Sequence, residues 1–115
     1  GDSLSIYSGN DDQIVPLLSM GGSGVISVLS NVLPRKTVEI CARFWSGDVS
    51  GSAALQCELL PLIHALFSEV NPIPVKAAVA MLGLCENEVR LPLLPLSSAH
   101  AHKLHEEMQK AGLIC

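Results

Sequence analysis

The sequence is poor in aromatic and charged residues. Aromatic side chains make up 3% of the 115 residues and charged side chains 16%, whereas globular domains carry about 25% charged residues. The core must therefore be built from aliphatic side chains, and the apolar share of 49% is high for a chain of this length. The formal net charge of −4 offers no basic surface, so nucleic acid is not expected as a partner.

No paired cysteine motif is present. The four cysteines, Cys41, Cys57, Cys85 and Cys115, are widely and irregularly spaced, without a CxxC pair. Disulfides need an oxidising compartment, and no basic-then-apolar leader signals one. We therefore expect reduced thiols, mostly buried on helices, in a cytoplasmic protein.

Charge is also absent from residues 13–34, a run long enough to cross a bilayer as one helix. The run contains Pro16, Gly21, Gly22 and Gly24, however, and these residues would break a single helix in its middle. We expect a helix, a turn and a buried strand here, and no membrane span.

The first part of the chain alternates strand and helix. Residues 3–8 are a β-prone run, and residues 10–12 supply an N-cap and negative charge for a helix that ends at Gly21-Gly22. Residues 24–28 form a second strand, and Pro34 stands at the first position of a helix reaching about residue 46. The spacing between the strands suits a right-handed parallel crossover.

After residue 47 the pattern is helical. Residues 50–69 carry a wide apolar stripe, and Pro74 opens a short helix that extends through residue 82. Two prolines exclude a helix over residues 91–97. A last helix is expected from about residue 99 to residue 111.

The strand at residues 24–28 needs more hydrogen-bonding partners than this chain offers. Its continuous apolar run is typical of a parallel strand covered on both faces. Two parallel strands alone leave both sheet edges unpaired, which is poorly stable. The sequence therefore predicts that further strands come from other chains or from a larger α/β protein.

Three segments carry a family resemblance. SIYSGNDDQIVPLLSMGGSGVISVLSNVLPR, then NPIPVK, then VRLPLLPLS resemble the C-terminal part of the dihydrodipicolinate synthase family. This family belongs to the pyruvate-dependent class I aldolases, together with N-acetylneuraminate lyase. The resemblance extends from Leu4 to Leu113. NPIPVK (71–76) followed by RLPLLPL (90–96) favours the synthase over the lyase.

The resemblance implies an α/β fold. The chain would hold the last two βα units of a (β/α)8 TIM barrel plus a C-terminal helical extension. Residues 1–46 would be the partial barrel and residues 47–115 the extension. The first six βα units would lie upstream of this chain.

The resemblance also implies a function. The parent protein would be a lyase that condenses pyruvate with aspartate semialdehyde in lysine biosynthesis, through a Schiff base on a lysine. That lysine and an assisting tyrosine would both lie upstream, so no catalytic residue and no cofactor is expected here, and the chain alone should be inactive. A Schiff-base amine needs a lowered pKa, usually through burial or a cationic neighbour. Lys36 has Arg35 beside it but lies in the first turn of a helix, where we expect it to be solvated. Lys76 lies on a short helix, and Lys103 and Lys110 lie on a polar one, so none of the four is expected to be the nucleophile.

Two alternatives stay open. One is another pyruvate aldolase of the same family, similar to N-acetylneuraminate lyase. The other is a non-catalytic helical module that self-associates, because unpaired strand edges and apolar surface need cover. In either case a homo-oligomer is expected.

Three residues are candidates for substrate binding. Ligands of barrel proteins bind at the carboxyl ends of strands, where Gly9 and Ile26 are expected. By resemblance, Ile26 offers its main-chain carbonyl near bound pyruvate, Gly9 leaves room for the ligand, and Asn71 reaches the rim of the site. Without the resemblance, Gly9 is a turn glycine and Ile26 a core residue.

Two other patterns carry no site. The glycines at residues 21–24 precede a strand, whereas a phosphate-binding loop follows one. His102 and Glu106 are four residues apart on one helix face, but spacing supplies no third ligand. We expect a solvated face there and no metal.

Overall fold

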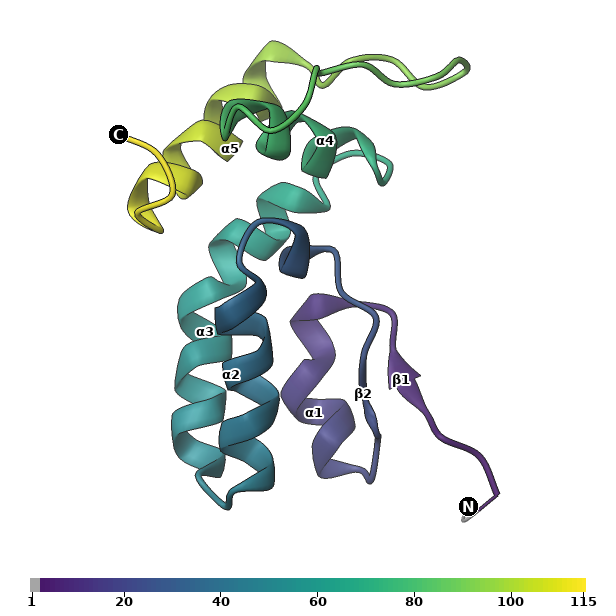
Figure 1. The fold of residues 1–115 in the computed structure, drawn as a ribbon, viewed down its shortest axis with the longest axis vertical. Coiled ribbons are helices and arrows are strands. Elements are labelled where there is room, and N and C mark those ends of the chain that lie inside the picture. Colours follow the sequence, from purple (N-terminus) through teal and green to yellow (C-terminus); the bar gives the residue numbers. More distant parts are fainter. Residues whose placement is uncertain (1–2) are drawn as a thin grey trace. The chain divides into compact units, whose positions relative to one another are not determined.

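The computed structural model describes residues 3–115, so the first two residues of the predicted region 1–46 lie outside the described residues. The chain divides into two compact units, Gly1–Leu60 and Pro61–Cys115. The longest helix, α3 (Val49–Leu66), contains the boundary between them. Each unit is described by itself (Figure 1).

The first unit contains a two-stranded parallel sheet. Strand β1 (Tyr7–Ser8) pairs with β2 (Gly24–Val25) in the register Tyr7 to Gly24 and Ser8 to Val25. The parallel pairing predicted from the spacing is confirmed, but both strands are shorter than residues 3–8 and 24–28. The backbone N–H of Ile26 still donates to the Ser8 carbonyl at 2.8 Å, so the pairing continues just beyond β2.

The cover expected over both faces of residues 24–28 is not supplied by the described residues. Ile26 is 70% exposed, and Val25 is only half-buried. Burial of a parallel strand needs helices or further strands over each face. The sheet of residues 3–115 has only these two strands, which leaves the outer face of β2 without cover.

Short helical segments follow each strand. A 3-10 turn, η1 (Asp11–Gln13), leads into α1 (Ile14–Ser19), and Gly21 closes this helix with φ of +92°. A second 3-10 turn, η2 (Leu29–Asn31), precedes α2 (Pro34–Trp45), and Pro34 occupies the first helical positions as predicted. In Figure 1, β1 and β2 run beside α1, and α1 packs against α2.

The N-cap predicted for residues 10–12 is wrong in its chemistry. Asn10 makes no side-chain capping hydrogen bond to the turn that follows it. Its neighbour Asp11 is fully buried and turns its carboxylate elsewhere, as described below. The local pattern therefore marked the helix start and its early negative charge, Asp11 and Asp12, correctly, but the predicted side-chain cap is not formed.

Helix α3 supplies apolar side chains to both units. It begins and ends close to the predicted residues 50–69 and contains Pro61 in its interior. Leu55 and Leu59 are buried on the part before the boundary, and Leu62, Ile63 and Leu66 on the part after it. Alone among the helices of residues 3–115, α3 is long and apolar enough to cross a membrane, with 44% of it buried inside the structure. Core helices also meet these criteria.

The second unit contains α4 (Ile73–Met81) and α5 (Ser98–Lys110), which pack against each other. Ser97 caps α5 by accepting a hydrogen bond from the His100 N–H. Gly83 and Gly112 follow α4 and α5 with φ of +76°, the left-handed conformation that glycine adopts at helix ends. The buried apolar residues of this unit outside α3 are Ile73, Val75, Ala77, Ala78, Leu104 and Met108.

The cysteine prediction is correct in one part and wrong in another. All four cysteines are free thiols. Only Cys41 is buried, while Cys57 and Cys115 are exposed and Cys85 is half-buried. Burial raises the pKa of the Cys41 thiol, which makes it a small apolar core residue rather than a reactive group.

Candidate functional site

The carboxyl ends of β1 and β2 bring two of the three predicted binding residues to one edge of the sheet. Gly9 follows β1 directly and Ile26 follows β2 directly. Parallel strands end at the same edge, and the Ile26 N–H to Ser8 carbonyl bond ties the two chain segments together there. This edge is where parallel α/β proteins bind their ligands.

Gly9 is not a turn glycine and Ile26 is not a core residue, which are the roles that the sequence without the resemblance suggested. A Cβ atom built on Gly9 would meet no heavy atom within 4 Å, and its φ is not positive, so neither crowding nor turn geometry requires glycine there. The Ile26 side chain is exposed and not a core residue. Among residues 3–115, no hydrogen bond reaches the Ile26 carbonyl oxygen, which is free to accept one.

The buried Asp11 carboxylate binds the chain segment that directly follows Ile26. One carboxylate oxygen, Oδ2, accepts hydrogen bonds from the N–H groups of Val28 at 2.9 Å and Leu29 at 3.0 Å. The other, Oδ1, accepts a short hydrogen bond from the Ser27 hydroxyl. The contact to Ser27 joins residues 16 positions apart. No sequence signal points to it, because an acidic residue at the start of a helical segment normally caps that segment.

Gln56 of α3 bonds to the backbone on both sides of the start of α1. Its Nε2 donates to the Asp11 carbonyl oxygen at 2.6 Å, and its Oε1 accepts from the Val15 N–H at 2.7 Å. Gln56 is only 4% exposed. A buried amide with both ends paired fixes the start of α1 against α3.

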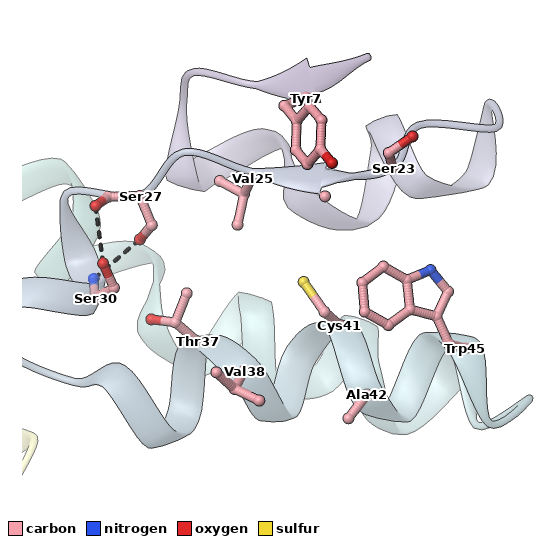
Figure 2. Close-up of a pocket in the computed structure, with 11 residues that line it drawn as sticks. Tyr7, Ser23, Val25, Ser27, Ser30, Thr37, Val38, Cys41, Ala42 and Trp45 are labelled. Atoms are coloured by element: carbon pink, nitrogen blue, oxygen red, sulfur yellow. Dashed lines mark hydrogen bonds between the residues drawn. The ribbon is translucent and has the colours of Figure 1, made fainter. Parts of the chain in front are cut away.

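An apolar groove lies between the sheet and α2. It encloses about 360 Å³ and is lined by Tyr7, Gly24 and Val25 on the sheet side and by Val38, Cys41 and Trp45 on the helix side. Figure 2 shows the Tyr7 ring above the groove and the Cys41 thiol and Trp45 indole directed from α2 toward β2. Trp45 is 61% exposed, so a large aromatic surface is without cover within the described residues.

Asn71 belongs to the second unit. It is exposed and stands in the turn between α3 and α4, directly before a cis peptide bond to Pro72. Ile73 then begins α4. Helix α3 already ends at Leu66, so the NPIP motif lies after its end and begins α4, close to the helix start predicted at Pro74.

A three-residue cluster ties the end of α3 to the start of α5 within this unit. Glu69 Oε2 accepts from the Ser97 N–H at 3.1 Å and the Ser97 hydroxyl at 2.9 Å, and it lies 2.5 Å from His100 Nδ1. The bond with His100, followed by those from Ser97, holds the pKa of the Glu69 carboxyl below its usual range. The cluster fixes the helix start.

The face of α5 with His102 and Glu106 is solvated as expected, with side chains 78% and 43% exposed, but the same helix also buries a carboxylate. Glu107 is only 5% exposed and pairs with Lys103 at 3.0 Å and Lys110 at 3.2 Å. The hydrogen bond from Lys103 lowers the pKa of Glu107, and Lys110 adds to this effect. His102 and Glu106 lie 3.3 Å apart, and residues 3–115 contain no group of three or more metal-ligating side chains.

The lysines show no sign of an activated amine. Lys36 pairs with Glu58 at 3.3 Å, and Lys103 and Lys110 pair with Glu107. The bond to Glu107 raises the pKa of Lys103, whereas a Schiff-base amine needs a lowered pKa.

These observations define an α/β protein whose candidate site lies at the carboxyl edge of a parallel strand pair. The model of the dihydrodipicolinate synthetase family matches residues 1–111. The chain belongs to this family. It is 57% identical, over 111 residues, to the 4-hydroxy-tetrahydrodipicolinate synthase of Lachnoclostridium phytofermentans, a match that covers 96% of this chain and 38% of that relative.

Solved structures show the same relation. The dihydrodipicolinate synthase of Thermotoga maritima matches with a TM-score of 0.96 and 47% identity, covering 98% of this chain and 38% of that one. A monomeric dihydrodipicolinate synthase variant also matches with a TM-score of 0.96, at 48% identity and with the same coverage. The chain therefore spans about 38% of the length of these relatives.

Proposed function

We propose that this chain is the carboxyl-terminal part of a cytoplasmic 4-hydroxy-tetrahydrodipicolinate synthase. The parent enzyme is a lyase that condenses pyruvate with aspartate semialdehyde through a lysine Schiff base in lysine biosynthesis. The observation that carries this proposal is the 57% identity to a relative of that name over nearly the whole chain. The same segments that form β1, β2 and the NPIP turn are those that resemble the family.

In this proposal residues 1–46 form the last two βα units of a (β/α)8 barrel and residues 47–115 the helical extension. The exposed outer face of β2 and the groove lined by Val38, Cys41 and Trp45 support it. Both are surfaces that the rest of a barrel would cover, and the neighbouring barrel strands would also pair with the open sheet edges.

The proposed binding roles follow the geometry of the strand ends. Ile26 offers a carbonyl oxygen that is free among the described residues, Gly9 leaves open space beside it, and Asn71 contributes to the rim from the NPIP turn. None of these groups is a nucleophile or a proton-transfer group. The residues of this chain therefore bind the substrate and shape its site. The Schiff-base lysine and its assisting tyrosine come from the upstream part of the barrel.

Borohydride trapping tests the proposal. The complete protein and the isolated 115-residue chain are each incubated with pyruvate, reduced, and mapped by peptide mass spectrometry. Lactate, which lacks the ketone that an amine attacks, is the matched control. We expect one reduced pyruvate adduct, on a lysine of the complete protein outside this chain, and none on the isolated chain. An adduct on Lys36, Lys76, Lys103 or Lys110, or no adduct on the complete protein, contradicts the proposal.

A second candidate function, self-association of the isolated chain, is supported by exposed apolar surface. Large exposed apolar side chains of the first unit gather near the sheet and α2: Leu4, Ile6, Ile26, Val38 and Trp45. Without an upstream barrel, a second copy is the available cover for such surface. Light scattering after size-exclusion chromatography tests this, and a chain that stays monomeric at high concentration rules it out. Whether the complete protein is a homo-oligomer is measured in the same way.

A further inference from the structure

Asp11 is a buried carboxylate without a cation. It is 0% exposed, and among residues 3–115 no lysine, arginine or histidine forms an ion pair with it. Burying an unpaired charge is costly unless hydrogen bonds compensate for it. Here Ser27, Val28 and Leu29 supply them. All three hydrogen bonds come from residues 27–29. Asp11 therefore fixes the conformation of this one short segment.

The segment that Asp11 holds is the turn that carries the Ile26 carbonyl. On one side of this carbonyl, the Ile26 N–H is fixed to Ser8 of β1 at 2.8 Å. On the other side, the next three residues, 27–29, are all bonded to the Asp11 carboxylate. The peptide group between Ile26 and Ser27 is therefore held between two anchors.

Asp11 is itself held in position. Its backbone carbonyl accepts the 2.6 Å bond from Gln56 of α3. The Ser27 hydroxyl, which donates to Asp11, also accepts from the Ser30 N–H at 2.9 Å, and Figure 2 shows Ser27 and Ser30 joined at the end of the groove. A continuous hydrogen-bonded path therefore runs from α3 through Asp11 to the turn after β2.

We propose that Asp11 is a positioning residue for the binding site: it orients the Ile26 carbonyl to accept a hydrogen bond from the iminium N–H that a 2-oxo acid forms with the upstream lysine, without touching the ligand itself. This inference rests on the proposed function for the identity of the ligand. A carbonyl oxygen favours a ligand only in one orientation, since its acceptor lone pairs are directional. A turn free to rotate at residues 26–27 loses that interaction and keeps the fold.

The competing explanation is purely structural. Val28 and Leu29 open the 3-10 turn η2, so Asp11 also satisfies N–H groups that have no partner inside that turn. A cap of this kind changes stability and leaves ligand affinity unaltered. The two explanations therefore differ in their effect on the pyruvate concentration that half-saturates the protein.

The test uses the complete protein with Asp11→Ala, Asp11→Asn and, as matched control, Asp12→Asn at the exposed neighbouring carboxylate. Hydrogen exchange of the peptide covering residues 24–33 reports the order of the turn. Borohydride trapping over a range of pyruvate concentrations reports half-saturation and the final adduct yield. Each variant is measured below its own melting temperature.

For Asp11→Ala we expect faster exchange in the 24–33 peptide and a rise of about tenfold in half-saturating pyruvate, because the iminium N–H of the pyruvate Schiff base loses its directional hydrogen bond to the Ile26 carbonyl. The adduct yield at saturation should stay unchanged. Asp11→Asn keeps an oxygen that accepts from Val28 and Leu29, so it should stay within about threefold of the wild type. Asp12→Asn should match the wild type.

The outcomes separate the two levels of inference. Wild-type protein that forms no pyruvate adduct overturns the proposed function. Wild-type protein that forms the adduct, with Asp11→Ala exchanging faster but binding pyruvate equally well, overturns the positioning role alone. If Asp11→Ala does not fold, Ser27→Ala decides, because it removes only one of the three bonds to Asp11, together with the bond from the Ser30 N–H. A rise of about threefold in half-saturation is then expected, and an unchanged value overturns the inference.

Discussion

Replacing Gln56 by leucine tests the hydrogen-bonded corner between α3 and the start of α1. Gln56 is 4% exposed and bonds the Asp11 carbonyl at 2.6 Å and the Val15 N–H at 2.7 Å. Leucine has a similar size but neither a donor nor an acceptor. The substitution therefore keeps the packing and leaves two backbone groups without a partner.

The expected loss of stability follows from these two groups. An unpaired buried donor or acceptor costs about 1–3 kcal/mol, so the two together cost about 2–6 kcal/mol. The apolar leucine side chain recovers about 1–2 kcal/mol of transfer free energy. Val15 is only half-buried, so water can partly replace the hydrogen bond to its N–H. The net loss in the free energy of unfolding should therefore lie in the lower half of the range, about 2 kcal/mol.

Urea denaturation measures this loss, with far-UV circular dichroism and Trp45 fluorescence as signals. Trp45 is the only tryptophan of the chain, and its fluorescence reports on the first unit. With a slope of about 2 kcal/mol per molar urea, a loss of about 2 kcal/mol lowers the midpoint by about 1 M. Gln13→Leu, the same change at an exposed position without a side-chain cap bond, is the control. Equal midpoints for Gln56→Leu and Gln13→Leu would refute the reasoning.

Three further predictions concern the second unit. Ser97→Ala removes the cap of α5 and should cost about 1 kcal/mol in a thermal melt, whereas Ser98→Ala should cost little; equal effects would argue against the cap. Because the bond from Lys103 lowers the folded-state pKa of Glu107, this pairing stabilises the fold above the ordinary carboxyl range and is lost as pH falls below about 4.5. Glu107→Gln should therefore flatten the dependence of the melting temperature on pH in the acid range, and an unchanged slope contradicts this. Gly83→Ala meets no atom within 4 Å but keeps φ of +76°, so backbone strain alone should cost about 1–2 kcal/mol, with Gly83→Asn costing less.

Local signals in the sequence located most helix ends. Pro34 begins α2, Ser97 caps α5, and Gly83 and Gly112 follow α4 and α5 with positive φ. Each of these signals acts through the backbone of residues within one helical turn, so the sequence pattern contains all the information needed. The parallel pairing of β1 and β2 was also predictable, because the length of the connection restricts how two strands meet.

The interior of the candidate site was not predictable in this way. The sequence placed Gly9 and Ile26 at the strand ends, but it used residues 10–12 only as an N-cap and negative charge for a helix. The Asp11 to Ser27 and Gln56 to Asp11 bonds join residues 16 and 45 positions apart. No pattern of neighbouring residues encodes such contacts, because they depend on which side chains packing brings together.

The sequence by itself determined the order of strands and helices, most of their ends and the family resemblance, because turn conformation, capping and hydrophobic periodicity operate over a few neighbouring residues. Only the tertiary structure decided which polar groups are buried. It turned Asp11 inward toward the turn after β2 and buried Glu107 between two lysines. The reason is physical: a charge is stable in the interior only where folding places enough donors around it. The donors to Asp11 come from residues 16 to 18 positions away, and Glu107, whose lysine partners are its neighbours on α5, is buried only when the helix packs.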